Sequence, residues 1–185
     1  MADVVEMKQR QLTQLLIGCG TNRDKRMGTA ATQAEDPGWG HLVTCDINPD
    51  HDPDVIADLR ETPWPFESNR FDEVHAYEVL EHLGAQGDYV TFFAQFSEIW
   101  RILKPGGKLL ATTPSPGSPW VWGDPSHTRA IFPETLIFLS QAEYAAQCGK
   151  NSMSDFRYIY KADFIPAHLE VDNGTFSFIL EAVKS

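Results

Sequence analysis

Two glycines and an acid are the first residues whose types and spacing could do chemistry. Gly18-Cys19-Gly20 ends an apolar run at residues 14–17, and a glycine turn after a buried strand lets a ligand come close to the backbone. Further along, a second apolar run at residues 41–45 ends in Asp46. A carboxylate there can accept hydrogen bonds from both hydroxyls of a ribose. The pattern predicts a nucleoside site, and a helix cap or a solvated loop acid is the alternative for Asp46.

Short apolar and β-branched runs separated by turn residues predict the sheet that positions these groups. The candidate parallel strands are residues 14–17, 41–45, 54–59, 71–77 and 108–113. The strongest helix has Asp88 as its N-cap and stops at Lys104-Pro105-Gly106-Gly107, because proline blocks continuation. Few residues separate the second and third strands, so a short loop without a helix must join them.

The C-terminal third predicts a loop, a helix and a hairpin. Residues 114–131 are rich in Pro, Gly, Ser and Trp, and loops of this length in a compact domain are usually functional or disordered. Pro133 is expected to begin a helix that runs to about Gln141. Asn173-Gly174 lies between residues 155–160 and 175–183, which predicts two closing antiparallel strands.

Composition limits the classes of function. With 185 residues and 42% hydrophobic content, the chain is expected to form a single domain over residues 1–185. Its 15 basic and 26 acidic side chains give a net charge of -11, which makes nucleic acid an unlikely partner and disfavours anionic membranes. The three scattered cysteines favour a reducing compartment. The apolar runs noted above are too short for a membrane span, so a cytoplasmic protein is expected; the oligomeric state is not predicted.

Five short motifs occur in a defined order between residues 14 and 114. They are Leu16-Ile17-Gly18-Cys19-Gly20, Asp46, Ala57-Asp58-Leu59, the stretch from Phe71 to His82, and Leu103-Lys104-Pro105-Gly106-Gly107-Lys108-Leu109. In this order they resemble the class I S-adenosylmethionine-dependent methyltransferases, and in particular the small type 11 group. The resemblance implies an α/β Rossmann-like sandwich. Its seven-stranded sheet would be mostly parallel with an antiparallel C-terminal hairpin, and few helices would lie between strands one and three.

The same resemblance implies S-adenosyl-L-methionine as cofactor and names the residues that would bind it. These are Gly18, Cys19, Gly20, Asp46, Ile47, Asp58, Leu59, Tyr77 and Glu78. Asp58 would accept from the adenine amino group and Leu59 would pack against the ring, while Tyr77 and Glu78 would lie near the methionine amine. Asp58 could instead cap the following turn, and Tyr77 and Glu78 could have ordinary packing or surface roles. The family often has an acid before its first glycine and a third glycine after the pair, where this chain has Leu16 and Asn22.

Methyl transfer from a sulfonium mainly requires proximity, alignment and exclusion of water. An acceptor hydroxyl or ammonium would also need a base. His127, with Asp124 nearby in the chain, is the first candidate and His82 the second. The alternative is that these residues are structural or merely line the substrate. The acceptor is left open between a small molecule, a sugar and a protein group.

The acidic series from Asp46 to Asp52 resembles the start of a calcium loop. His51 and Ala57 occupy the positions where such a loop needs glycine and glutamate, so no metal site is predicted. A nucleotide- or NAD-binding oxidoreductase is a rival function, although Arg23 occupies the position of the third glycine in the dinucleotide-binding motif. A catalytically silent scaffold with the methyltransferase fold is the other rival, because fold alone does not determine function.

Overall fold

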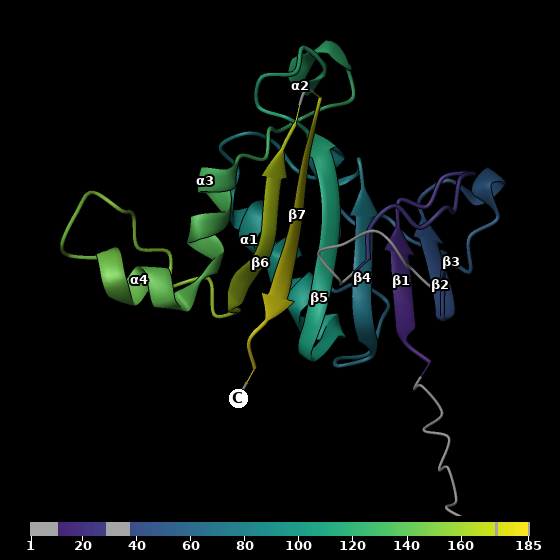
Figure 1. Cartoon of the computed structure of the whole chain (residues 1–185), viewed down its shortest axis with the longest axis horizontal. Helices are drawn as coiled ribbons and strands as arrows, with labels where there is room; N and C mark the ends of the chain where they lie inside the picture. Colours follow the sequence, from purple (N-terminus) through teal and green to yellow (C-terminus); the bar gives the residue numbers. More distant parts are fainter. Residues whose placement is uncertain (1–10, 29–37, 173, 185) are drawn as a thin grey trace, which may run out of the picture.

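A seven-stranded sheet organises the chain (Figure 1). The computed structural model describes residues 11–28, 38–172 and 174–184. The strands are β1 (Thr13–Ile17), β2 (His41–Asp46), β3 (Val55–Ile56), β4 (Phe71–Tyr77), β5 (Leu103–Pro114), β6 (Phe164–Val171) and β7 (Thr175–Ala182). Their spatial order is β3-β2-β1-β4-β5-β7-β6, and β7 runs opposite to the other six. This confirms the predicted Rossmann-like sheet with an antiparallel closing hairpin.

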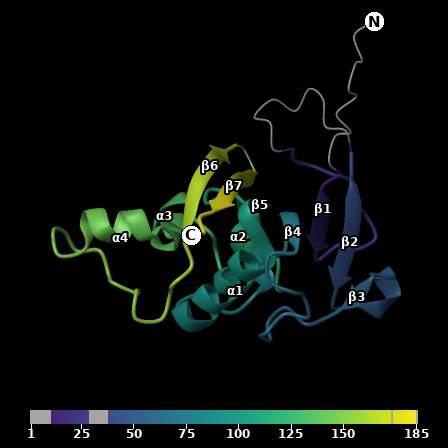
Figure 2. The ribbon, with the colours of Figure 1, turned by 90° about the horizontal axis from the view of Figure 1, so that it is seen from below.

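One face of the sheet is covered by helix α1, Tyr89–Ile102 (Figure 2). The Asp88 side chain accepts from the Thr91 amide at 3.0 Å, as expected of the N-cap. Buried Phe92, Phe96 and Ile99 pack into the main core with side chains from the sheet. β5 begins at the residue that follows α1, so no loop separates the helix from the strand.

The opposite face carries a smaller apolar cluster. It contains Leu16, Cys19, Met27, Tyr77, Leu110 and Ile179. Within the described ranges, no helix contributes a buried side chain to this cluster, and residues 26–27 are bound to β4 instead. The Tyr77 hydroxyl accepts from the Met27 amide at 3.2 Å. Between β2 and β3 the described chain has only a 3-10 turn, as predicted, whereas residues 29–37 of the predicted helix-poor region lie outside the described residues.

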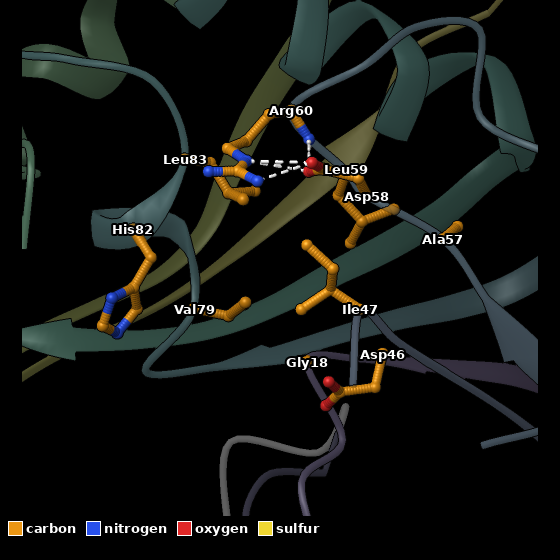
Figure 3. Close-up of a pocket in the computed structure, with 10 residues that line it drawn as sticks. All are labelled: Gly18, Asp46, Ile47, Ala57, Asp58, Leu59, Arg60, Val79, His82 and Leu83. Carbon is orange, nitrogen blue, oxygen red and sulfur yellow. Dashed lines mark hydrogen bonds and ion pairs between the residues drawn. The ribbon is translucent and has the colours of Figure 1, made fainter. Parts of the chain in front are cut away.

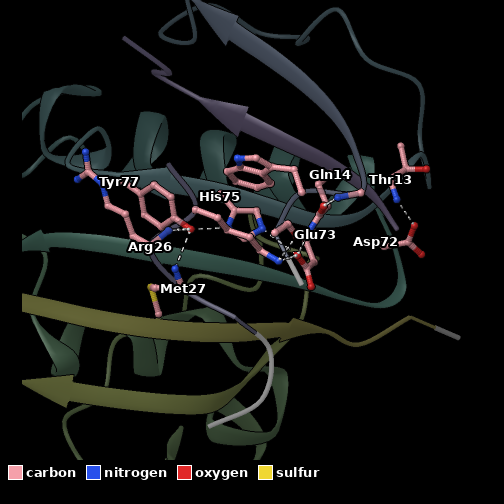
Figure 4. Close-up of polar contacts among 12 residues, drawn as sticks. Thr13, Gln14, Arg26, Met27, Asp72, Glu73, His75 and Tyr77 are labelled. Carbon is pink, nitrogen blue, oxygen red and sulfur yellow. Dashed lines mark hydrogen bonds and ion pairs between the residues drawn. The ribbon is translucent and has the colours of Figure 1, made fainter. Parts of the chain in front are cut away.

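A buried polar chain continues from Tyr77 along β4 (Figure 4). The Tyr77 hydroxyl lies 2.6 Å from His75 Nδ1, and His75 Nε2 lies 2.8 Å from Glu73 Oε2. The Gln14 side-chain amide, on β1, also donates to Glu73. Burial opposes the charge on Glu73, but the hydrogen bonds from His75 and Gln14 hold its pKa below the ordinary value. The carboxylate therefore joins β1 to β4 in its ionised form.

We expect Glu73→Gln to make the free energy of unfolding less dependent on pH in the acid range. The pKa of Glu73 is lower in the folded protein than in the unfolded chain. Its contribution to stability is therefore fully present at pH values above the unfolded-state pKa, and it is lost as the pH falls through the folded-state pKa. Each proton taken up on unfolding gives a slope of about 1.4 kcal/mol per pH unit. Urea unfolding at stepped acid pH should show a steeper decline for the natural chain than for Glu73→Gln. Glu67→Gln, at an exposed carboxylate, is the control, and equal slopes in all three proteins would contradict the prediction.

The connection between β2 and β3 is short, as predicted, but the third strand is shorter than residues 54–59. The loop contains only a 3-10 turn at Pro49–His51, and β3 pairs in parallel with β2 at Val55 and Ile56. Asp58 then ends the extended segment, because its Oδ1 accepts from the Arg60 amide at 2.9 Å.

The prediction of a strand at residues 155–160 is wrong. This segment forms turns: the Asp155 carboxylate accepts from the Arg157 amide, and the Phe156 carbonyl accepts from the Tyr160 amide at 2.9 Å. The partner of β7 is β6, which contains Pro166 and a register shift beside it. Proline is tolerated there because β6 is an edge strand. Asn173 of the predicted hairpin turn lies outside the described residues.

The helix predicted from Pro133 to about Gln141 is interrupted. It consists of α3 (Pro133–Leu136) and a 3-10 turn at Ile137–Leu139. Ser140 then adopts an extended conformation and caps a new helix, α4 (Gln141–Gln147), by accepting from the Glu143 amide. The predicted loop before Pro133 contains a short helix, α2 (Trp120–Gly123). Among the described residues, no helix is long and apolar enough to cross a membrane.

Candidate active site

A cavity of about 320 Å³ lies where the loops after β1, β2, β3 and β4 converge (Figure 3). In open α/β sheets this edge, outside the carboxyl ends of the strands, is where ligands bind. The cavity is lined by Gly18, Asp46, Ile47, Ala57, Asp58, Leu59, Arg60, Val79, His82 and Leu83. Five of the predicted cofactor residues and one predicted catalytic histidine therefore meet at one site.

Gly18 makes the turn after β1 in a conformation that disfavours other residues. Its φ is +58°, and a Cβ built on it would lie 2.5 Å from Val79 Cγ2. The missing side chain thus allows the loop after β4 to pack directly on the turn after β1. Gly18 and Val79 both line the cavity as a result.

Asp46 is fixed at the end of β2 by amides from two loops. Its carboxylate accepts from the Gly20 amide at 2.8 Å and from the Asn48 amide at 2.9 Å, and His51 Nδ1 lies 3.2 Å away. Burial alone would raise the pKa of Asp46, but these hydrogen bonds and the His51 ring lower it below its ordinary value. A carboxylate can accept about four hydrogen bonds, so acceptor capacity remains for a ligand.

The wall opposite Asp46 combines apolar side chains with an ion pair. Ile47 is 54% exposed although it is apolar, and Leu59 is buried. The Asp58 carboxylate is held by Arg60, whose Nη2 lies 2.6 Å from Asp58 Oδ2. Asp58 also caps the following turn through the Arg60 amide, and it lines the cavity.

The other predicted cofactor residues do not line the cavity. Cys19 and Tyr77 pack in the apolar cluster on the opposite face of the sheet. Gly20 contributes through its backbone N–H, which donates a hydrogen bond to the Asp46 carboxylate. Glu78 has a φ of +56°, and its amide donates to the Thr112 carbonyl at 2.9 Å, so a strained residue directly follows β4.

The predicted catalytic residues come together beside the cavity although they are far apart in the sequence. The His82 and His127 rings pack edge to face with centroids 4.7 Å apart. His127 Nε2 is 4.0 Å from Asp124 Oδ2 and 3.9 Å from Glu81 Oε1. Glu81 is 1% exposed, and burial above all, with the nearby Glu78 and Asp124 carboxylates, raises its pKa to about 8.

Sequence reasoning missed Glu81, Arg60 and His51. Glu81 precedes His82 within one of the recognised motifs, so its position was known, but its burial depends on the loop at residues 124–129. Arg60 follows Asp58 by two residues, a spacing that permits a local ion pair. His51 was considered only as an argument against a calcium loop. Its contact with Asp46 comes from the 3-10 turn between β2 and β3.

The sheet order is that of the class I methyltransferase fold, and a cavity with an acid lies outside the carboxyl ends of its strands. Residues 15–111 match the methyltransferase domain family, which is more than half of the chain. The chain belongs to this family, and the resemblance inferred from the motifs is confirmed.

Three solved structures illustrate the shared fold. A SAM-dependent methyltransferase from Archaeoglobus fulgidus is 17% identical with a TM-score of 0.56, covering 93% of this chain and 86% of that one. An S-adenosylmethionine-dependent methyltransferase from Mesorhizobium loti is 13% identical with a TM-score of 0.55, covering 92% and 91%. The N-methyltransferase NodS from Bradyrhizobium japonicum, in complex with S-adenosyl-L-homocysteine, is 14% identical with a TM-score of 0.53, covering 94% and 79%. The comparison with curated protein sequences finds no match.

Proposed function

We propose that this protein transfers a methyl group from S-adenosyl-L-methionine to an acceptor that enters beside His82 and His127. The observation that carries the proposal is the Asp46 carboxylate, fixed by the Gly20 and Asn48 amides at the rim of an otherwise mostly apolar cavity. A carboxylate next to apolar walls suits a nucleoside, which has a polar ribose and a flat base. The family membership and the S-adenosyl-L-homocysteine in NodS support the choice of cofactor.

Each lining residue has a defined task in this proposal. The cofactor supplies a methyl group on a positively charged sulfur, which is already a good leaving group. Asp46 accepts from the ribose hydroxyls with its remaining lone pairs, and Ile47 and Leu59 contact the adenine ring. Asp58 accepts from the adenine amino group while it keeps part of its pairing with Arg60. The backbone at Gly18 permits close approach of the ribose and the methionine tail.

The acceptor is a small molecule, a sugar or a protein group. His82 is part of the cavity wall, so an acceptor adjoining the methyl group would meet the His82 and His127 pair. If the acceptor loses a proton on methylation, these imidazoles are the nearest candidates to receive it, directly or through a water. In this proposal Asp124, whose Oδ2 lies 4.0 Å from His127 Nε2, stabilises the protonated imidazole.

Calorimetry on the full chain tests the proposal. We expect S-adenosyl-L-methionine and S-adenosyl-L-homocysteine to bind with one site per chain, and NAD not to compete with them. Transfer of labelled methyl groups to a component of a cell extract should then identify the acceptor. Failure of the folded protein to bind either sulfur compound would overturn the proposal. Preferential binding of NAD would favour the oxidoreductase alternative, and cofactor binding without any transfer would favour a silent scaffold.

A further inference from the structure

Glu81, His82 and His127 form a group that the cofactor site does not explain. One ligand atom from each lies within 4.8 Å of the other two. The Glu81 side chain is 2% exposed, that of His127 is 8% and that of His82 is 33%. Neither carboxylate oxygen of Glu81 has a hydrogen-bond partner among the described residues. A buried carboxyl group without a hydrogen-bond partner is costly, and a cation beside it would offset the repulsion from the nearby Glu78 carboxylate.

The hydrogen bonds of the two imidazoles determine which ring nitrogens are available. His127 Nδ1 lies 2.8 Å from the Trp120 carbonyl oxygen, and His82 Nδ1 lies 3.2 Å from that of Ser126. A carbonyl oxygen can only accept, so each Nδ1 carries a proton and donates it. In the neutral rings, each Nε2 then presents a lone pair. This backbone fixing of the second nitrogen is typical of histidines that bind metals.

The two Nε2 atoms lie near the same carboxylate oxygen. Nε2 of His82 and Nε2 of His127 lie 4.0 and 3.9 Å from Glu81 Oε1, which is too far for a direct hydrogen bond. Tetrahedral zinc with bonds near 2.1 Å holds its donors about 3.4 Å apart. The glutamate oxygen and each nitrogen would have to approach by about half an ångström, and the widest pair of ligand atoms, which lie within 4.8 Å of each other, by up to about 1.4 Å to share one ion.

We propose that Glu81, His82 and His127 bind a divalent transition-metal ion such as zinc at the edge of the cofactor cavity. Two imidazoles and one carboxylate suit such ions better than magnesium or calcium, which prefer oxygen ligands. Three protein ligands also leave a position open for water or another ligand, as in catalytic metal sites. Because His82 lines the cavity, the ion would adjoin the place where the acceptor is expected. This proposal departs from the expectation of no metal, which considered only residues 46–57.

A metal at this position changes the role given to the histidines. Their Nε2 lone pairs would be occupied by the ion, so neither imidazole could act as a free base. Asp124, 4.0 Å from His127 Nε2, would then neighbour a ligand of the ion instead of stabilising a protonated base. Metal binding is measured without cofactor or acceptor, so its outcome is independent of the proposed methyl transfer.

The test uses the full chain after removal of metals with a chelator. Calorimetry with Zn²⁺ should give one ion per chain, and Co²⁺ should give visible absorption bands typical of four- or five-coordination. Glu81→Gln, His82→Gln and His127→Gln should each weaken binding by roughly a hundredfold. His168→Gln is the matched control, because His168 pairs with the Glu170 carboxylate at 3.3 Å on β6 and is not a member of this group.

A second measurement does not depend on how the variants fold. Crystals of the natural chain soaked in Zn²⁺ should give an anomalous peak at the zinc edge between Glu81, His82 and His127. Absence of that peak from crystals of the folded protein would overturn the proposal. Binding that survives both Glu81→Gln and His127→Gln would do the same. Circular dichroism of each variant establishes that a lost ion does not reflect a lost fold.

Discussion

Asp46→Ala is expected to weaken S-adenosyl-L-methionine binding by roughly a hundredfold or more, because hydrogen bonds to a charged acceptor contribute about 1.5–3 kcal/mol each. The substitution removes the proposed acceptor for two ribose hydroxyls. It also frees the Gly20 and Asn48 amides that the carboxylate now joins. The loops after β1 and β2 would then lose their common anchor. Calorimetry with the cofactor and with S-adenosyl-L-homocysteine measures the effect.

Two matched variants distinguish the role of the Asp46 carboxylate from the effect of removing any negative charge from this loop. Asp50→Ala removes an exposed acid from the 3-10 turn of the same loop and should leave affinity within about twofold, as expected for surface substitutions. Asp46→Asn keeps the shape of the side chain but loses one acceptor oxygen and the charge, so an intermediate loss is expected. Equal affinities for the Asp46→Ala and Asp50→Ala variants would remove Asp46 from the cofactor site.

The sheet could be predicted from the sequence where local signals agreed with the fold. β4 was identified with its observed bounds, Phe71–Tyr77, because apolar and polar residues alternate between two turns. Helix α1 was predicted from the N-cap at Asp88 to a stop at Lys104-Pro105; it ends at Ile102, and Lys104 and Pro105 already belong to β5, which begins earlier than the predicted residue 108. β6 was missed because Pro166 disfavours a strand, and only its position at the sheet edge makes the proline acceptable.

The site was predictable in part because strand ends are ligand-binding positions. Gly18 and Asp46 follow buried strands, and their loops converge at the cavity as that rule requires. The alternation along β4 contained a further signal, since Glu73, His75 and Tyr77 are spaced by two residues and share the face opposite the cavity wall. Period-two reasoning could therefore have placed the Tyr77 side chain away from the cavity.

The pairing of His82 with His127 had no local signal. The loop after β5 returns to the loop after β4 because the Thr128 and Arg129 amides both donate to the Glu81 carbonyl, at 2.9 and 3.2 Å. These are irregular long-range backbone contacts, which leave no periodic pattern in the sequence. The histidines could be proposed as candidates from their residue type, but their proximity could only be seen in the structure.

Gly18→Ala is expected to destabilise the protein by about 2–5 kcal/mol, and this is the largest stability effect we predict for the site. A left-handed alanine costs about 1–2 kcal/mol, and overpacking adds about 1–3 kcal/mol. The overpacking arises because the new Cβ would lie 2.5 Å from Val79 Cγ2. Gly20 provides the matched comparison, since its φ is +53° but a Cβ there would meet nothing within 4 Å.

Urea unfolding of Gly18→Ala, Gly20→Ala and the double variant Gly18→Ala with Val79→Ala separates strain from crowding. Gly20→Ala should show only the backbone cost. Val79→Ala should recover part of the loss in the double variant because it removes Cγ2, the nearest atom, although Val79 Cβ at 2.9 Å remains. Identical losses for Gly18→Ala and Gly20→Ala would mean that contact with Val79 is unimportant. Since Val79 also lines the cavity, the displacement that relieves the clash in Gly18→Ala should lower cofactor affinity in the molecules that remain folded. Gly20→Ala keeps the amide that binds Asp46, so its affinity should be closer to that of the natural chain.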